Sequence, residues 1–382
     1  MKTIRDPIHG QIRLEETILK IIDTPQFQRL RRIKQLGFAN LVYPGANHTR
    51  FEHSLGVMHI ASKLTDNLEI VVAALLHDIG HPPFSHSSER IVKKYLRYEH
   101  EDVKRIIDGE LKDVLKEYGF SLNKISKHIR FNPIISGEID TDRMDYLVRD
   151  SYYTGVAYGV FDVERLIDKT YFDGKRLIIE SGGLKAAESL LISRYMMYPT
   201  VYYHHVCRIA RKMYEKALEF LINEGFDAKN LLHMDDFDVV SLMRNSNCAK
   251  EMIELIDSRK LFKRAIYVGR DRVDLKEITR INEERIEEEI AGEVGIETKY
   301  VIVDVQPIEE VKEFSALVDV DGELVKLEEV SPLIKALKLA EMENWRLGVY
   351  TKREYVEKVG KIASKLLNLD KIPKQKTLDE IS

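Results

Sequence analysis

The sequence predicts a mainly α protein with one small β-hairpin in its helical core and a smaller C-terminal α+β region. Two observations favour this fold class. From about residue 52 to about residue 225, apolar residues recur with the spacing of buried or amphipathic helices. After about residue 293, strand-like runs such as KYVIVDV and SALVDVDGELVKL alternate with helical segments.

Composition sets the broad class of the protein. The chain has 382 residues, of which 44% are hydrophobic and 32% charged, so it can bury a substantial core and is not a disordered chain. Lys plus Arg number 59 and Asp plus Glu 63, which gives a net charge of −4 and argues against a dedicated nucleic-acid coat protein. The two cysteines exclude a disulfide scaffold.

The N-terminal residues, MKTIRDPIHG, lack the apolar region of a signal peptide, and no run of about 18 apolar residues occurs. We therefore expect a cytoplasmic protein with no membrane segment. Asp6-Pro7 and His9-Gly10 are typical of turns. Thr24 and Pro25 predict the start of a strongly basic helix that Gly37 ends.

Further along, residues 70–80 are apolar enough to form a fully buried helix. Asp173-Gly174 predicts the turn of a β-hairpin over residues 171–180. A long helix is expected after Gly183 and through about Glu224, with a kink at Pro199. Shorter helices are expected over 226–292 and a small α+β unit after that.

Histidines are concentrated in one part of the chain. Seven of the twelve fall between residues 48 and 100, as they do when they form a metal or acid–base site: His48, His53, His59, His77, His81, His86 and His100.

His77-Asp78 is the sharpest element of this cluster, because it follows the buried apolar helix. Burying a neighbouring imidazole and carboxylate is costly unless something pairs with them, and a divalent cation does so. His53 and Asp142 are the candidate partners, and such a ligand set suits Fe, Mn, Mg, Ni or Zn. The alternative is that His77 and Asp78 form a buried hydrogen-bonded pair or a helix cap.

The spacing His53 … His77-Asp78 … Asp142 resembles the H…HD…D pattern of the HD-domain metal-dependent phosphohydrolases. Longer segments resemble the deoxynucleoside triphosphate triphosphohydrolases, which include bacterial dGTPases and the vertebrate dNTPase that carries a SAM domain. These segments are DPIHGQIRLEETILKIIDTPQFQRLRRIKQLG, RFEHSLGV, LLHDIGHPPFSH and TDRMDYLVRDSYYTG. The resemblance covers about the first 210 residues, matches the C-terminal third only loosely, and implies a helical HD-domain core.

The resemblance implies a role for each matching residue. The implied metal ligands are His53, His77, Asp78 and Asp142. The implied catalytic residues are His81, His86, Glu89 and His100. Glu89 stands where the vertebrate member has Asp, three residues after His86 and on the same helix face. His100 lies in an ordinary charged segment, so a purely structural role is its alternative.

Residues that match substrate contacts are Gln35, Leu36, Arg50, Arg143, Tyr146, Asp150 and Tyr203. Arg143 replaces a Lys of the vertebrate member, which keeps the charge and adds bidentate geometry. Tyr203 would lie against the deoxyribose and exclude a 2′-hydroxyl. Tyr195 and Pro199 replace polar contacts of that member, so base preference is not carried over.

Asp23, Gln28 and Arg31 match a guanine-nucleotide activator site, and Lys2 and Arg5 match neighbouring contacts to a second nucleotide at a subunit interface. The alternative is that the basic run is simply a solvated surface. An interface site implies a homo-oligomer, either a dimer or a tetramer. The paired tyrosines at 152–153 and 202–203 are more often core or pocket wall than nucleic-acid stacking platforms, so nucleic acid is a disfavoured partner.

Residues 1–225 are thus expected to form the catalytic core with an N-terminal regulatory segment, 226–292 a helical extension, and 293–382 the α+β region. The expected reaction is metal-dependent hydrolysis of a dNTP, with dGTP among the substrates, to deoxynucleoside and triphosphate. Water attacks the α-phosphate, and nucleotide activation is implied. The alternatives are another HD-domain phosphatase or phosphodiesterase, or a nucleotide- or nucleic-acid-binding regulatory protein with weak activity.

Overall fold

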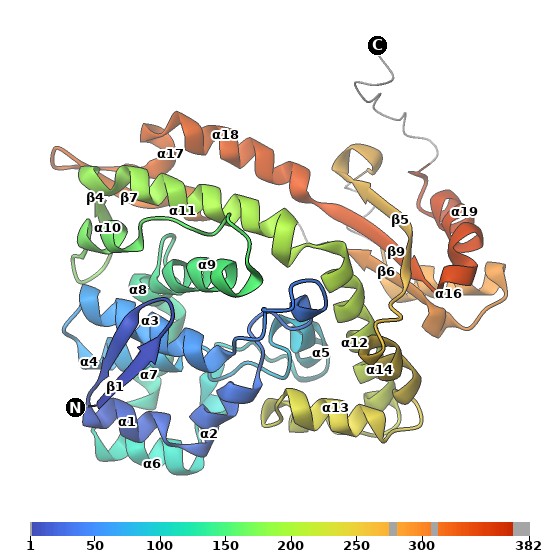
Figure 1. Cartoon of the computed structure of the whole chain (residues 1–382), viewed down its shortest axis with the longest axis horizontal. Helices are drawn as coiled ribbons and strands as arrows, with labels where there is room; N and C mark the ends of the chain where they lie inside the picture. Colours follow the sequence, from blue (N-terminus) through green and yellow to red (C-terminus); the bar gives the residue numbers. More distant parts are fainter. Residues whose placement is uncertain (1, 275–280, 307–311, 370–382) are drawn as a thin grey trace.

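The computed structural model of the chain describes residues 2–274, 281–306 and 312–369. Helices form most of it, and three small sheets complete it, which confirms the predicted mainly α class (Figure 1). The helical body contains the N-terminal hairpin and the helices up to α14, while β5, β9 and β6 lie beside it with α16 and α19.

The α-helices are α1 (Glu16–Ile22), α2 (Pro25–Gln28), α3 (Arg50–Leu64), α4 (Leu68–Leu76), α5 (His86–Leu96), α6 (Gly109–Glu117), α7 (Leu122–Phe131), α8 (Pro133–Ser136), α9 (Thr141–Thr154), α10 (Val163–Asp168), α11 (Leu184–Met197), α12 (His205–Asn223), α13 (Asp236–Arg244), α14 (Lys250–Asp257), α16 (Glu283–Val294), α17 (Leu327–Val330), α18 (Pro332–Glu341) and α19 (Val356–Leu366). The strands are β1 (Lys2–Asp6), β2 (Gly10–Leu14), β3 (Thr170–Phe172), β4 (Leu177–Glu180), β5 (Lys263–Gly269), β6 (Val301–Val305), β7 (Leu317–Val320), β8 (Glu323–Lys326) and β9 (Arg346–Thr351).

The two predicted turns near the N-terminus belong to one β-hairpin that the sequence did not predict. Its strands, β1 and β2, pair antiparallel from Lys2 opposite Leu14 to Asp6 opposite Gly10. Ile12 and Leu14 are buried while their neighbours in β2 are exposed, so the hairpin covers the core with one face only.

The predicted basic helix is shorter than expected. Pro25 is its first helical residue, as predicted, but α2 ends at Gln28 and continues only as a 3-10 turn over Arg29–Arg32. Ile33 is extended, and its carbonyl accepts a hydrogen bond from Arg50 N at 2.9 Å. Lys34 then forms an isolated bridge with Thr49. Tertiary pairing with the start of α3 therefore ends the helix before Gly37.

The long helix predicted over 184–224 is broken rather than kinked. α11 ends at Met197, a π-helical turn spans Tyr198–Tyr202, and α12 begins at His205. Pro199 has no N–H to donate to the preceding turn, so the regular ladder stops at this point. The break turns the chain from α11 into α12.

The predicted hairpin at 171–180 is confirmed as β3 and β4, which pair antiparallel. It belongs to a larger sheet of order β3-β4-β7-β8, in which β7 lies parallel to β4. The third sheet has the order β5-β9-β6, and the sequence reading missed both β5 and β9. Residues of the predicted α+β unit therefore contribute strands to two sheets, and its last residues, 370–382, lie outside the described part of the chain.

Three clusters of buried apolar side chains hold these layers together. The largest joins the N-terminal hairpin to α3, α4, α5, α7, α12 and α14. A second lies around α9, α10 and α11 with β4 and β7, and α18 packs beside α11 (Figure 1). The third fills the space between the β5-β9-β6 sheet and the helices α16 and α19.

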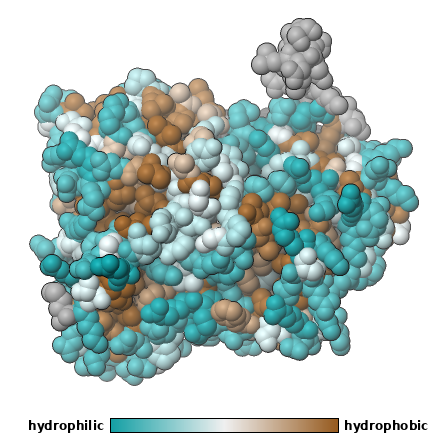
Figure 2. Space-filling view, viewed as in Figure 1, coloured by the Kyte–Doolittle hydropathy of each residue, from teal (hydrophilic) through white to brown (hydrophobic). Residues whose placement is uncertain are grey.

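The surface is mostly hydrophilic with scattered apolar patches on the viewed face (Figure 2). Within the described ranges, no helix is both long and apolar enough to cross a membrane.

Candidate metal centre and active site

Four side chains from three helical segments converge between α3, α4 and α9. His53 lies on α3, His77 and Asp78 follow the last residue of the buried helix α4, and Asp142 is in the first turn of α9. His53 Nε2 lies 3.3 Å from His77 Nε2 and 3.0 Å from Asp142 Oδ1. His77 Nε2 and Asp142 Oδ1 are 3.8 Å apart.

Asp78 lies beside this donor set. Its Oδ1 lies 3.3 Å from His77 Nε2, and its Oδ2 lies 3.6 Å from His53 Nε2. Neighbouring donors are spaced about 3 to 4 Å apart when they bind one cation at about 2.1 Å. His53, His77 and Asp142 therefore form a group able to hold a single divalent cation, and Asp78, the fourth predicted ligand, lies next to both imidazoles.

The two imidazoles are already oriented for a ligand. His53 Nδ1 donates to Asp145 Oδ2 at 2.7 Å, and His77 Nδ1 donates to the Ala74 carbonyl at 2.8 Å. Both Nε2 atoms are thereby left facing the shared centre, which is the arrangement of anchored metal-binding histidines.

The electrostatics of the centre favour a positive charge. Burial lowers the pKa of His53, but the carboxylates of Asp142 and Asp145 outweigh it and raise the pKa to about 10. Burial opposes ionisation of Asp142, yet the hydrogen bond from His53 brings its pKa down to about 2. Carboxylates that stay ionised while buried provide the negative charge that a cation would neutralise.

A second group of side chains adjoins this centre through Asp78. His81 Nε2 lies 3.1 Å from Asp78 Oδ1, and its ring stacks on His100 with centroids 4.1 Å apart. Glu89 joins the group: its Oε1 lies 2.7 Å from His100 Nδ1, and its Oε2 lies 2.8 Å from His86 Nδ1. The structure thus brings all four predicted catalytic residues together.

Glu89 carries the negative charge of this group. Burial raises its pKa, but His86 and His100 overcome that effect and hold the pKa well below its usual range. Burial would lower the pKa of His100, but the bond to Glu89 raises it to about 9. Glu89 and His100 therefore form an ion pair, while His86 keeps its Nε2 free and 60% of its side chain exposed.

Arg50 and Gln35, both predicted substrate contacts, have unused hydrogen-bonding capacity within the described chain. Arg50 donates from Nη1 to Asp78 Oδ2 at 2.7 Å and from Nε to Ser85 Oγ at 2.9 Å, but its Nη2 has no partner within the described chain. Gln35 is buried, and its Oε1 is likewise unpartnered there. Buried donors and acceptors of this kind indicate a ligand.

Asp150 lies between two aromatic segments. Its Oδ1 accepts from His48 Nε2 at 2.7 Å, and its Oδ2 accepts from the Tyr202 hydroxyl at 2.9 Å. The ring of Tyr202 also lies 6.2 Å from that of Tyr146. Tyr202 therefore contacts the predicted substrate-binding residues, whereas the ring of Tyr203 packs against Tyr198.

The remaining predicted substrate contacts, Arg143 and Leu36, are partly buried. The Arg143 guanidinium contacts the Asp140 carboxylate and donates to the Gly137 carbonyl at 3.1 Å. Leu36 is partly buried against the cluster around α9–α11.

The predicted activator residues lie on the surface of the N-terminal segment. Lys2 and Arg5 are exposed on β1, and Asp23 is exposed directly after α1. Gln28 accepts from Arg31 Nε at 2.8 Å, and the Arg31 guanidinium covers the Phe51 ring at 3.5 Å from its centroid.

The sequence reading missed a buried network behind His53. Asp145 accepts from His9 Nε2 at 2.6 Å and from Arg149 Nε at 2.8 Å, and Arg149 Nη1 donates to Asp6 at 2.8 Å. Asp145 and Arg149 follow Asp142 at three and seven residues, so helical spacing was the available signal. Nothing in the sequence linked them to the N-terminal turn.

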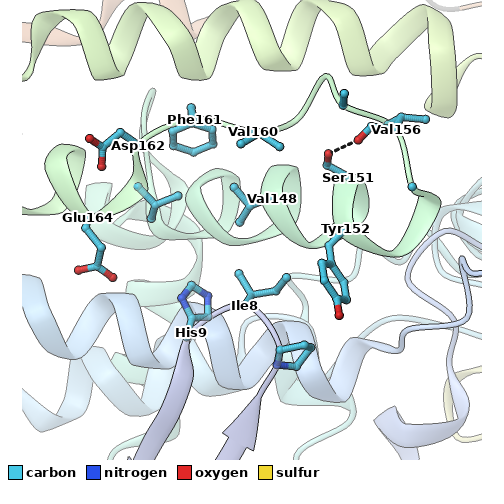
Figure 3. Close-up of a pocket in the computed structure, with 14 residues that line it drawn as sticks. Ile8, His9, Val148, Ser151, Tyr152, Val156, Val160, Phe161, Asp162 and Glu164 are labelled. Atoms are coloured by element: carbon cyan, nitrogen blue, oxygen red, sulfur yellow. Dashed lines mark hydrogen bonds between the residues drawn. The ribbon is translucent and has the colours of Figure 1, made fainter.

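A cavity of about 670 Å³ adjoins this network at His9 (Figure 3). The turn of the N-terminal hairpin, one face of α9 and residues 155–164 line it, with Ile8, Val148, Val160 and Phe161 as apolar walls. It does not include the metal centre. His9 connects the two, since it lines the cavity and also contacts Asp145.

Comparison with known proteins identifies the class of this fold and site. The family model described as HD domain matches residues 50–150, and that described as HD associated region matches residues 161–378. The uncharacterized protein MJ1154 of Methanocaldococcus jannaschii is 41% identical over 379 residues, which cover 94% of this chain and 81% of that protein.

Two further relatives have named activities. The deoxynucleoside triphosphate triphosphohydrolase SAMHD1 homolog of Dictyostelium discoideum is 29% identical over 404 residues, covering 87% of this chain and 74% of the relative. The crystal structure of a phosphohydrolase from Bacteroides thetaiotaomicron superimposes with a TM-score of 0.73 at 25% identity, covering 92% of this chain and 100% of that one.

The chain therefore belongs to the HD-domain phosphohydrolase family. Within it, the chain is one of the members in which an HD-associated region follows the HD domain. HD domains bind divalent metal ions, and His53, His77 and Asp142 form a group able to hold one.

Proposed function

We propose that this protein is a metal-dependent dNTP triphosphohydrolase that converts a dNTP and water into a deoxynucleoside and inorganic triphosphate. The observation that carries the proposal is the junction of two groups at Asp78. The four-residue donor set lies on one side and the His81–His86–Glu89–His100 group on the other. The Dictyostelium relative, named for this activity, supports it.

A divalent cation held by His53, His77, Asp78 and Asp142 would polarise the α-phosphate and lower the pKa of the attacking water. The water oxygen forms a bond to the α-phosphorus, and the bond from phosphorus to the 5′-oxygen breaks. The chain must then supply a proton to the 5′-oxygen, because an alkoxide is a poor leaving group.

His86 is the proton donor in this proposal. Glu89 accepts a hydrogen bond from its Nδ1 at 2.8 Å, which would leave Nε2 to donate a proton to the 5′-oxygen. The imidazole is also the most exposed of the group, so a substrate can reach it. His100, Arg143 and the unpartnered Nη2 of Arg50 would neutralise charge on the phosphates, and His81 would contact them as a neutral imidazole, because burial lowers its pKa.

Recognition of the deoxynucleoside is assigned to residues around Asp150. Gln35, Leu36 and Tyr146 would contact the nucleoside, and Asp150 would bind the sugar. Tyr202, rather than Tyr203, is proposed as the residue against the deoxyribose, because its hydroxyl bonds to Asp150. Product analysis with each dNTP tests base preference, including activity on dGTP.

We also propose that a guanine nucleotide activates the enzyme at Lys2, Arg5, Asp23, Gln28 and Arg31, at an interface between copies of the chain. Exposed cationic and amide side chains on the N-terminal hairpin and α1–α2 support this. A dimer or tetramer would complete such a site.

The test is product analysis. The protein is incubated with each dNTP, alone and with GTP or dGTP added, in separate assays with Mn²⁺, Mg²⁺, Fe²⁺, Ni²⁺ or Zn²⁺. Inorganic triphosphate and deoxynucleoside in equal amounts are the expected products. Release of monophosphate would instead identify an HD-domain phosphatase or phosphodiesterase.

A regulatory protein that binds nucleotides or nucleic acid is the second candidate. Its expected result is nucleotide binding without turnover under every metal condition. A salt-dependent gel shift with DNA or RNA would separate it further, since phosphate-backbone binding weakens steeply as salt rises.

A further inference from the structure

The loop between α4 and α5, residues 79–85, carries two residues in an unfavourable backbone conformation. Phe84 has φ of 55° and Ser85 has φ of 53°, in the left-handed region that favours glycine. Neither is glycine, so both conformations cost free energy and persist only where surrounding contacts hold them. The loop ends directly before His86, the proposed proton donor.

A carboxylate from outside the HD domain holds this loop. Asp236, the first residue of α13, accepts from the Phe84 amide through Oδ1 at 2.6 Å. Its Oδ2 accepts from the Lys34 amide at 2.9 Å. The side chain thus bridges two backbone segments that the chain brings together from far apart, and it is only 5% exposed.

A short series of hydrogen bonds leads from these amides to the metal centre. Ser85 Oγ donates to the Lys34 carbonyl at 2.7 Å and accepts from Arg50 Nε at 2.9 Å. Arg50 Nη1 then donates to Asp78 Oδ2 at 2.7 Å. The position of Ser85 relative to Lys34 therefore sets where the Arg50 guanidinium lies beside Asp78.

Arg29 links the segment before Lys34, the loop and the segment before Asp236 at a second point, through hydrogen bonds. Its Nη2 donates to the carbonyls of Ile79 and His81 at 2.8 and 3.0 Å, and its Nη1 donates to the Met234 carbonyl at 2.8 Å. Residues 29–34, 79–85 and 234–236 thus form a junction, which we name the loop junction. Asp236 is the carboxylate in this junction that contacts both residues 29–34 and residues 79–85.

We propose that Asp236 is a positioning residue, which holds Phe84 and Ser85 in their left-handed conformations and thereby places Arg50 and His86 for the reaction. The inference rests on the proposed roles of Arg50 and His86. Burial raises the pKa of Asp236 to about 7, although its hydrogen bonds to the two amides lower it. Burying this carboxylate therefore costs folding free energy.

The test compares Asp236→Asn with Asp238→Asn. The side-chain oxygen of Asn can accept a hydrogen bond from one of the two amides, but its NH2 group faces the other amide. Two donors then face each other at the second position, and one hydrogen bond is lost. Asp238 is a matched control, because it lies on the same helix and its carboxylate accepts a hydrogen bond from the Asp235 amide, at 3.0 Å, away from the loop. Turnover per folded molecule, KM, bound metal and Tm are measured for each.

The expected result is a fall in kcat of about tenfold for Asp236→Asn, the factor that loss of one hydrogen bond to a charged group gives. Bound metal stays at the wild-type level, because the four ligands are untouched. Asp238→Asn keeps the wild-type kcat and loses only stability. Wild-type kcat in Asp236→Asn would overturn the proposal.

A double-mutant cycle with Ser85→Ala separates positioning from general stability. If Asp236 acts by placing Ser85 Oγ, adding Asp236→Asn to Ser85→Ala lowers kcat little further. If the two effects multiply, Asp236 does not act through Ser85, and the proposed placement of Arg50 is wrong. Should Asp236→Asn not fold, Asp236→Glu is used in the same cycle, and failure of both to fold assigns Asp236 a structural role only.

The same assays show whether the proposed function itself has failed. If wild-type protein releases no triphosphate but hydrolyses a generic phosphodiester such as bis-p-nitrophenyl phosphate, the triphosphohydrolase assignment falls. The Asp236 cycle is then run on that substrate, and its outcome stands by itself.

Discussion

At the scale of single residues, the metal centre depends on how each imidazole is held. His53 and His77 both use Nδ1 for a fixed acceptor, one a carboxylate and the other a main-chain carbonyl. Their Nε2 atoms therefore meet at 3.3 Å, and a cation that binds there would replace the proton that His53 shares with Asp142. The roles of the ligands and of His86 can be separated by mutation.

His77→Ala should abolish both bound metal and turnover, because it removes one of the two imidazole donors. His86→Ala should keep metal and lower kcat by about 10²- to 10⁴-fold, the contribution of a general acid. Metal analysis of the purified variants, with product assays, checks both. His233→Ala is the control, as this histidine is exposed. Full activity in metal-free His77→Ala protein would rule out the proposed chemistry.

The Glu89–His100 pair predicts a specific pH dependence of stability. Glu89 has a folded pKa well below its usual 4.5, so it stabilises the fold above that value. His100 has a folded pKa of about 9 against 6.5 unfolded, so its contribution is full below 6.5 and is lost as the pH rises through 9. Both contributions are complete only between these two unfolded values.

Glu89→Gln should therefore lower Tm most near pH 5.5, at about the middle of that window, and much less above about pH 9. Thermal unfolding at several pH values measures the difference. Glu101→Gln is the matched control, since Glu101 lies 3.5 Å from the other nitrogen of His100 and is 38% exposed. A difference between Glu89→Gln and wild type that does not change with pH would contradict the ion pair.

At the scale of elements, close contact between α3 and α9 brings His53 to Asp142. Gly56 permits it: a Cβ at this position would lie 1.8 Å from Asp145 Oδ1 and 2.7 Å from Arg149 Nη2. The missing side chain at Gly56 of α3 therefore leaves room for Asp145 to reach His53, one helical turn away.

Gly56→Ala should destabilise the fold by about 1 to 3 kcal/mol through overpacking, and should reduce metal binding because Asp145 must move. Gly292→Ala is the control, since Gly292 lies inside α16 with nothing within 4 Å of its added Cβ. That change should raise stability by roughly 0.5 to 1 kcal/mol. Urea unfolding and metal titration of both variants decide; equal stability for the two would contradict the contact.

At the scale of the whole molecule, a buried ion pair joins the helical body to the β5-β9-β6 sheet. Arg208 on α12 donates from Nε to Asp304 Oδ2 on β6 at 2.7 Å, and both side chains are at most 2% exposed. The Tyr350 hydroxyl on β9 donates to the same carboxylate at 3.0 Å. Arg208 holds the pKa of Asp304 well below its usual range, in spite of burial.

Asp304→Ala should therefore cost roughly 3 to 5 kcal/mol of stability, because it leaves the Arg208 charge buried without its partner. Asp257→Ala is the comparison, since its bond to Arg244 lies between side chains that are 38% and 55% exposed and contributes little. Equilibrium unfolding in urea measures both. Similar losses for the two variants would show that the Arg208–Asp304 contact is not the link between the two parts.

The strongest sequence signals came from local patterns. The apolar run of α4, the His77-Asp78 pair that follows it and the Asp-Gly turn of the β3–β4 hairpin each follow from neighbours along the chain. Strands β5 and β9 were missed because their partners lie far away in sequence. A short strand that is stabilised by distant pairing has little signature of its own.

The same limit applies to the site. Tyr202 and Tyr203 are adjacent aromatics in the sequence, and only the π-helical turn that precedes α12 decides that Tyr202 faces Asp150. Asp236 lies 150 residues or more from the loop that it holds, as Phe84 and Lys34 are 152 and 202 residues away. No periodicity connects residues at such separations.

The sequence by itself determined the residue types that can bind a cation, the buried helix that delivers two of them, and the mainly α character of the chain. The tertiary structure alone decided which neighbours hold those ligands, where the basic helix ends, and how a carboxylate of α13 reaches the loop before α5. The physical reason is that side-chain chemistry and helical spacing are local properties. Hydrogen bonds between distant segments exist only after the chain has packed.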